Sequence, residues 1–241
     1  MQLIRPTDIP PNTLTATDAV LTASNVATDD AAEWTSGTSY STGDQVIVLG
    51  TTQRLYEALQ ASTGSFPPDN PTDWNDLGAI NRWKMFDGGT NTQTSNPDSI
   101  DVTLEPSGII NSFTLFNLNA AEARVVMTDA TEGVVFDKTY NLIDNSAVDD
   151  WYAYFFEPIA RATQLSDLSL PAYGDAAIDI TLTEAGADVK CGLAVIGQQA
   201  TIGTTVFGTS VGIRDFSRKE VDEFGNFTIV ERRFFREVDY D

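Results

Sequence analysis

The chain has 241 residues, of which 41% are hydrophobic and 10% aromatic, so it can bury a sizeable core and is not a disordered polymer. Its 35 acidic residues outnumber its 14 basic residues, and the net charge of −21 argues against a nucleic-acid partner and against insertion into anionic membranes. The absence of histidine and the single cysteine, Cys191, exclude His-dependent nucleophiles, a disulfide framework and the usual zinc sites, so we expect no cofactor and no metal.

Residues 1–32 are predicted to form an extended N-terminal arm. Pro6, Pro10 and Pro11 interrupt regular structure, and large apolar side chains are sparse. Such a segment is either a disordered tail or an arm that orders against a neighbouring subunit. The amino terminus lacks the layout of a signal peptide, and no stretch approaches the roughly 18 consecutive apolar residues of a membrane span, so we expect neither.

Residues 33–80 are predicted to form a small β module. The β-rich runs 45–49 and 54–59 flank a Gly-Thr-Thr turn and indicate a hairpin. Three prolines and a glycine within residues 62–73 exclude a helix or a central strand there. A module of this size has little room for a core, so its aromatic residues must supply most of the packing.

Residues 81–202 are predicted to form an antiparallel β-sandwich or jelly roll. Short runs that alternate between apolar and polar residues, or that are continuously apolar, recur every ten to fifteen residues between turn signals. The runs are 99–104, 112–116, 124–127, 134–136, 178–183 and 193–196. The aromatic run 151–156 precedes Glu157-Pro158, which disfavours a long helix, and we expect this run to fill the sandwich core as a strand or buried loop. The fold class is therefore all-β.

Residues 203–241 are predicted to form a C-terminal β-hairpin arm. Two strand-like runs, 213–221 and 227–235, flank a glycine-containing turn. Six of the fourteen basic residues of the chain lie here: Arg214, Arg218, Lys219, Arg232, Arg233 and Arg236. A basic, aromatic hairpin would dock on an acidic neighbour, such as another copy of this acidic chain, so these residues are predicted to lie at a subunit interface. A solvated charged hairpin is the alternative.

No catalytic or nucleotide-binding motif stands out. With 35 acidic residues, neighbouring carboxylates such as Asp149 and Asp150 are unavoidable, and most are solvated surface charges. The segment 69–76 is rich in oxygen ligands but lacks the EF-hand calcium-loop pattern, and the chain has no phosphate-binding glycine loop. We therefore expect a protein that is not an enzyme.

The aromatic residues of the small module follow a fixed order. The order is Trp34-x-x-Gly37-x-x-Tyr40-x-x-Gly43-Asp44-x-Val46, then Leu55-Tyr56-Glu57-Ala58, then Trp74. In this order the module resembles the compact chitin- and cellulose-type carbohydrate-binding modules of families 5 and 12. The resemblance implies that ring faces stack on sugars while carboxylates accept hydrogen bonds, through Trp34, Tyr40, Asp44, Tyr56, Glu57 and Trp74. Each ring is also a candidate for the core of so small a module, and Phe66 is an alternative sugar contact.

A wider resemblance covers nearly the whole chain. Residues 1–9, 81–87 and 214–233 are similar to virion proteins of tailed bacteriophages, usually tail or baseplate components. This resemblance implies a structural virion protein that is made in the host cytoplasm, assembles as a homo-oligomer with other tail proteins and attaches to host-surface glycans. The alternatives are a purely architectural virion adaptor that binds no sugar and a polysaccharide depolymerase.

Overall fold

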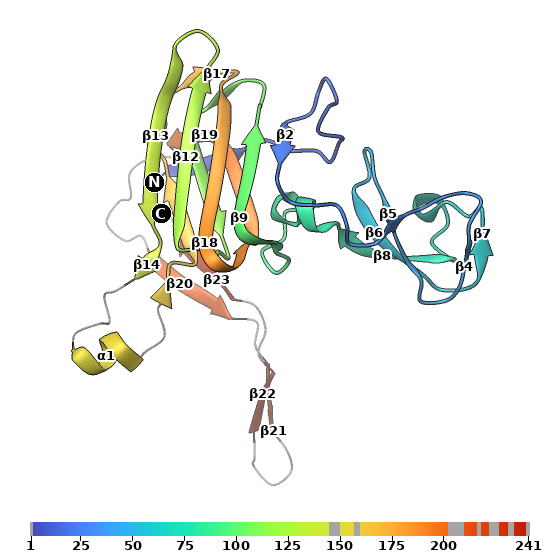
Figure 1. The fold of residues 1–241 in the computed structure, drawn as a ribbon. Helices are drawn as coiled ribbons and strands as arrows, with labels where there is room; N and C mark the ends of the chain where they lie inside the picture. Colours follow the sequence, from blue (N-terminus) through green and yellow to red (C-terminus); the bar gives the residue numbers. More distant parts are fainter. Residues whose placement is uncertain are drawn as a thin grey trace. The chain divides into compact units, whose positions relative to one another are not determined.

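The structure is a computed structural model that describes residues 2–144, 150–156, 160–201, 210–215, 218–221, 227–230 and 234–239. The chain divides into two compact units, one of residues 4–199 and one of residues 1–3 together with 200–241. The fold is all-β with antiparallel sheets, as the sequence predicts, and the larger unit contains both the sandwich and the small module (Figure 1).

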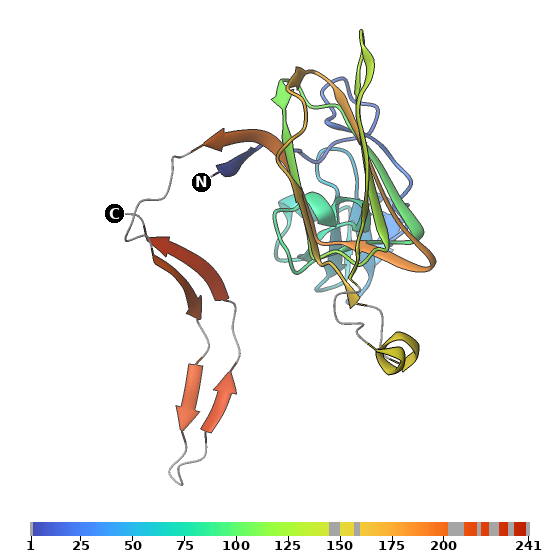
Figure 2. The same ribbon diagram turned by 90° about the vertical axis from the view of Figure 1, so that its left-hand side faces the viewer.

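Two sheets form the sandwich, and Figure 2 shows them as separate layers. The five-stranded sheet has the order β13-β12-β18-β9-β2, with β13 (Gly133–Asn141), β12 (Glu122–Asp129), β18 (Ala177–Cys191), β9 (Thr94–Leu104) and β2 (Leu21–Ser24). The four-stranded sheet has the order β1-β19-β11-β16, with β1 (Gln2–Pro6), β19 (Leu193–Thr201), β11 (Ser112–Phe116) and β16 (Gln164–Asp167). Two short antiparallel pairs come from the segments between these strands. One joins β10 (Ile109–Ile110) to β17 (Tyr173–Gly174), and the other joins β14 (Ile143–Asp144) to β15 (Ala160–Arg161).

Alternation along the strands builds the core. In β18, Ile178, Ile180 and Leu182 are fully buried, while the residues between them are partly exposed. Successive side chains of a strand point to opposite faces, so this pattern places every second residue between the sheets. Cys191 lies in the same core with no exposed surface, and burial raises the pKa of its thiol to about 12. The thiol is therefore structural, as the apolar sequence around it indicates.

The N-terminal segment is not separate from the sandwich. We expected residues 1–32 as an arm, but β1 and β2 each supply an edge strand, one to each sheet. Leu21 and Val26 are buried in the main core, and Asn25 bonds to the backbone and side chain of Asp101 on β9. The few apolar residues of this segment gain enough burial to hold it against its own chain rather than against a neighbouring subunit.

The small module contains two sheets of its own. Strands β3 (Ala32–Glu33), β5 (Gln45–Val48), β6 (Arg54–Ala58) and β8 (Trp74–Ala79) form one, and β4 (Ser39–Tyr40) pairs with β7 (Ser62–Thr63). The predicted hairpin is the antiparallel pair of β5 and β6. Val46 and Val48 face the core of the module, whereas Ile47 between them belongs to the main core. One face of this sheet therefore packs towards the sandwich, beside the short 3₁₀ helix η2 (Asn81–Phe86).

The aromatic run does not fill the sandwich core. Residues Trp151–Phe156 form the short helix α1, and four of its side chains are between 67% and 78% exposed: Trp151, Tyr152, Phe155 and Phe156. The prediction of a strand or buried loop was wrong. The inward-facing residues of the two sheets already occupy the interior, so no space remains there for four more large rings.

The C-terminal unit contains the predicted hairpin. Strand β20 (Ser210–Asp215) pairs antiparallel with β23 (Phe234–Asp239), and β21 (Arg218–Val221) pairs antiparallel with β22 (Phe227–Val230) (Figure 2). The register is Ile213↔Arg236 and Arg214↔Phe235 in the first pair and Arg218↔Val230 in the second. The predicted turn, residues 222–226, lies outside the described residues.

Candidate functional site

Three of the four predicted sugar-stacking rings lie inside the module. Tyr40, Tyr56 and Trp74 are 9%, 5% and 2% exposed, and Tyr40 contacts Trp74 edge to face with centroids 5.1 Å apart. Their polar ends also have partners within the module: the Tyr40 hydroxyl accepts a bond from the backbone N–H of Thr35, and Trp74 Nε1 donates to the carbonyl of Ser65. Burial removes these rings as stacking surfaces. Their packing supplies the core that so small a module needs.

Trp34 keeps part of its surface exposed and contacts a second ring. It lies against Phe66 with centroids 5.1 Å apart and planes at 63°, and both rings are half-buried on the edge of the module core. Trp34 Nε1 has no hydrogen-bond partner among the residues that the structure describes. This pair, Trp34 and Phe66, is the aromatic surface that the module retains after its core is built.

A set of hydrogen bonds fixes the loop that carries Phe66. The Asp73 carboxylate accepts bonds from the Ser65 hydroxyl at 2.5 Å and from Gln60 Nε2 at 2.6 Å, and these bonds hold the pKa of Asp73 below its usual value. On the other side, Asn70 Nδ2 donates to the Phe66 carbonyl at 2.8 Å. These hydrogen bonds therefore fix the backbone of the proline-rich segment, and with it the position of the Phe66 ring.

The two predicted carboxylate partners have local roles. Asp44 accepts a bond of 2.7 Å from the backbone N–H of Ser41 and so closes the turn before β5. Glu57, on β6, accepts a bond of 3.3 Å from Gln45 Nε2 on the paired strand. The structure therefore does not gather the six predicted residues around one binding surface. Trp34 alone of the four rings remains at the surface.

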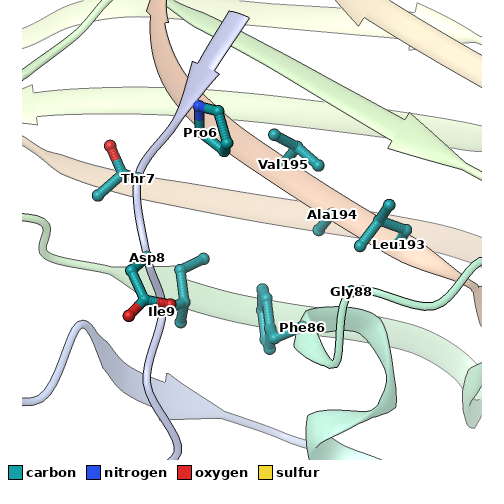
Figure 3. Close-up of a pocket in the computed structure, with 9 residues that line it drawn as sticks. All are labelled: Pro6, Thr7, Asp8, Ile9, Phe86, Gly88, Leu193, Ala194 and Val195. Atoms are coloured by element: carbon teal, nitrogen blue, oxygen red, sulfur yellow. The ribbon is translucent and has the colours of Figure 1, made fainter.

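Two adjoining cavities lie where segment 6–11, β19, η2 and the β5–β6 turn meet. One, of about 240 Å³, is open to solvent and is lined by residues 6–9, 193–195, Phe86 and Gly88, and Figure 3 shows Ile9, Phe86 and Leu193 around it. The other, of about 220 Å³, shares Asp8, Ile9 and Phe86 with the first and adds residues 52–54, Ala79 and Trp83. Sequence reasoning missed both cavities because their walls come from segments far apart in the chain, and no local pattern marks them.

The predicted basic interface falls in the C-terminal unit. Arg214, Arg218, Lys219 and Arg236 lie on its paired strands, whereas Arg232 and Arg233 lie outside the described residues. Their role at a subunit interface stays a prediction.

The described part of the chain contains neither a candidate metal centre nor a membrane-spanning helix. There, no group of three or more acidic or cysteine side chains is placed to hold a metal ion. Among the same residues, no helix combines the length and the apolar character needed to span a bilayer.

Comparison with known proteins gives a partial sequence match and distant structural likenesses. No protein-family model matches the chain. Over 92 residues, 38% of this chain, it is 34% identical to Ulvan lyase from Nonlabens ulvanivorans, and the match covers 18% of that protein. The chain thus spans less than a fifth of this relative.

The structural neighbours are similar over about half of the chain. Chitosan-binding module 1 of a chitosanase/glucanase from Paenibacillus sp. IK-5 has 12% identity and a TM-score of 0.32, covering 48% of this chain and 83% of the module. The lectin domain of Lectinolysin, complexed with Lewis B antigen, has 11% identity and a TM-score of 0.34, with 49% and 84% covered. A third, CpGH89CBM32-5 from Clostridium perfringens, has 13% identity and a TM-score of 0.30, with 47% and 81% covered. Likeness at this level assigns no function to the chain.

Proposed function

We propose that this protein binds polysaccharide without cleaving it, through the surface formed by Trp34 and Phe66. The observation that carries the proposal is that these two rings stay partly exposed, in contact with each other, while the other large rings of the module form its core. A sugar ring presents a face of C–H groups that packs on an aromatic plane, and the exposed parts of these two rings offer such a surface.

Three further features support this proposal. The sequence order of the module resembles carbohydrate-binding modules, and 92 residues of the chain resemble a segment of a protein named as a lyase of the polysaccharide ulvan. Two buried carboxylates have structural partners: Asp167 bonds to Lys138 and Tyr140, and Glu184 to Arg161. Because these carboxylates are engaged in contacts between strands, they serve the fold rather than a reaction, and this favours binding over catalysis.

The test is affinity electrophoresis of the full chain in gels that contain ulvan, chitin derivatives, cellulose derivatives or bacterial surface polysaccharides. We expect retardation in at least one gel, and Phe66→Ala should weaken it about tenfold, which corresponds to about 1.4 kcal/mol. Leu77→Ala is the matched control, because Leu77 is an exposed apolar residue of the same module at 42% exposure. Leu77→Ala should leave binding unchanged.

The same samples separate binding from cleavage. Incubation with each retained polysaccharide should release no reducing ends and no unsaturated sugars. Release of either product would overturn the non-catalytic part of the proposal, and the absence of retardation in every gel, even with a multimerised chain, would overturn binding itself.

In biological context, we propose that the chain is a tail or baseplate component of a bacteriophage virion that attaches to host-surface glycans. This proposal rests on the resemblance of residues 1–9, 81–87 and 214–233 to such proteins. Antibody labelling of particles should locate the protein at the tail, and several copies there would strengthen a weak sugar contact through avidity. Labelling of the head alone would contradict the proposal.

A purely architectural role is the second candidate, and the exposed helix α1 favours it. Four aromatic side chains at least two-thirds exposed on six residues form a surface that is typical of protein contacts. In that case, replacing Tyr152 and Phe156 with serine should lower the oligomeric mass measured by light scattering, while polysaccharide binding stays absent in wild type and variant. An unchanged mass would remove the observation that favours this role.

A further inference from the structure

The 220 Å³ cavity has two buried polar side chains in its wall with unused hydrogen-bonding capacity. Gln53 is 5% exposed and Trp83 is 3% exposed, and both line the cavity. A buried polar atom without a partner destabilises the folded state, so folded proteins contain few of them, and two among the residues that line one cavity indicate a ligand site.

The orientation of the Gln53 amide is fixed. Its Nε2 donates to the carbonyl of Asn12 at 2.8 Å and to that of Gly50 at 2.9 Å. Since only the NH₂ end can donate to two carbonyls, the oxygen end must be Oε1, and this acceptor has no partner within the described residues. The backbone of Gln53 also has φ of 49°, a left-handed conformation that is uncommon for a non-glycine residue. Strained residues of this kind cluster at ligand sites.

Trp83 supplies the complementary group. Its backbone N–H donates to Ile80 at 2.8 Å, and its ring contacts Phe86 edge to face with centroids 5.9 Å apart, so its position is set by η2. The indole Nε1 can only donate, and no described residue accepts from it. Two residues that line the cavity therefore carry one unused acceptor and one unused donor, both without exposed surface, and Ile9 and Phe86 add apolar surface to the lining.

Two of the charged groups at this cavity already have partners. Arg54 forms an ion pair with Asp76 at 2.7 Å, and the carboxylate of Asp87 accepts bonds from the backbone of Gly89 and the hydroxyl of Thr92, both at 2.7 Å. The third, Asp8, is exposed to solvent at the cavity. The buried unused groups, Gln53 Oε1 and Trp83 Nε1, are neutral, one acceptor and one donor. A neutral ligand with hydroxyl groups that both donate and accept, and with an apolar face, matches them. The volume exceeds the roughly 30 Å³ of one water and is below the roughly 300 Å³ of pockets for drug-sized ligands.

We propose that this cavity binds a single neutral sugar unit, with Gln53 Oε1 accepting from one hydroxyl and Trp83 Nε1 donating to another oxygen. Both atoms are covered by neighbouring atoms, so the ligand reaches them after a local adjustment of the cavity wall. The ligand class rests on the proposed function, whereas the site is distinct from the Trp34 and Phe66 surface. The protein would then bind a chain at its module and one sugar unit in the cavity.

Two tyrosine variants test the site by filling it. Thr52 lines the cavity, whereas its neighbour Thr51 is exposed and does not, so Thr52→Tyr blocks the space and Thr51→Tyr is the matched control. The full chain is titrated with neutral hexoses and pentoses, a uronic acid and an amino sugar, and binding is followed by ligand-observed NMR. We expect a neutral sugar to bind wild type and Thr51→Tyr equally and Thr52→Tyr at least about tenfold more weakly.

Trp83→Phe tests the donor itself. This change keeps an aromatic ring but removes Nε1, so it should weaken the same sugar about tenfold while thermal unfolding shows that the variant is folded. Equal binding by wild type and Thr52→Tyr, preference for a charged sugar, or no binding of any sugar would each overturn the proposal. If polysaccharide retention persists and depends on Phe66 in those cases, the cavity proposal fails alone. If retention also disappears, the proposed function fails with it.

Discussion

At the residue scale, each aromatic side chain of the small module could either pack in its core or stack on a sugar, and burial shows which of the two each ring can do. Tyr40, Tyr56 and Trp74 lie in the module core, whereas Trp34 and Phe66 remain at its surface. Local order in the sequence marks all of these rings as important but does not show which face of each ring meets solvent. That depends on how β4, β6 and β8 pack.

The first prediction concerns Trp74. Trp74→Ala should destabilise the module by about 3–5 kcal/mol, because it removes a ring that is 2% exposed and a hydrogen bond to Ser65. Urea unfolding of the full chain should show this loss, while Phe66→Ala, at the half-exposed ring, should cost less than half as much. Equal losses in the two variants would contradict the division between core and surface rings.

The second prediction concerns Asp167, which joins the edges of the two sheets. Burial alone would raise the pKa of Asp167, but hydrogen bonds from Ser169, Tyr140 and Lys138 outweigh burial and hold it far below its usual range. Because the folded-state pKa is depressed, these contacts contribute their full stability above the unfolded pKa of about 3.9. That contribution is lost as the pH falls from about 4 through the folded-state value.

Asp167→Asn should therefore be about 2 kcal/mol less stable than wild type at pH 7, and the difference should shrink as the pH falls below 4. Denaturant unfolding at several pH values measures it. Comparing the two proteins at each pH removes the contribution of the other carboxylates. A difference that stays constant down to pH 2 would show that charge on Asp167 has no part in stability.

At the element scale, edge strands decide how the N-terminal segment is held. β1 lies beside β19, and the backbone N–H of Thr7 donates to Ile196 at 2.9 Å. Gly197 permits this approach, because a Cβ there would lie 2.0 Å from the carbonyl oxygen of Arg5. No sequence pattern within residues 1–32 reveals a partner about 190 residues away, which explains why the arm was expected to extend from the fold.

The third prediction follows from this contact. Gly197→Ala should displace β1 from the sheet edge and destabilise the protein by about 1–3 kcal/mol. The new methyl group would overlap the backbone of Arg5, which cannot rotate out of the way as a flexible side chain could. Limited proteolysis should then cleave within the first ten residues. Gly37→Ala is the control, because a Cβ at Gly37 meets nothing within 4 Å. An N-terminal segment as protected in Gly197→Ala as in wild type would refute the prediction.

At the scale of the whole molecule, the net charge of −21 is the dominant electrostatic property. Folding brings like charges together, and their mutual repulsion opposes the compact state. Salt screens this repulsion, with a Debye length of about 10 Å at 0.1 M.

The fourth prediction is that sodium chloride stabilises the protein at pH 7. Raising its concentration from about 10 to about 300 mM should increase the melting temperature by about 2–4 °C, which corresponds to about 1 kcal/mol for a chain of this size. Near pH 4.1, the isoelectric point, the net charge vanishes and the increase should disappear. Calorimetry at both pH values checks this, and an equal salt response at both would show that net charge is not the cause.

The sequence by itself determined the elements whose signal is local. Alternation in 178–183 and 99–104 predicted two strands of the sandwich. The runs around the Gly-Thr-Thr turn predicted the hairpin of the module, and the runs 213–221 and 227–235 predicted the C-terminal hairpin. These elements were predictable because strand formation and tight turns depend on neighbouring residues. Only the tertiary structure decided which aromatic rings are exposed, where the first 32 residues pack and that Gln53 and Trp83 line one cavity. These outcomes depend on contacts between distant segments, and the run 151–156 shows the difference: its apolar character predicted burial, but the two sheets had already filled the interior.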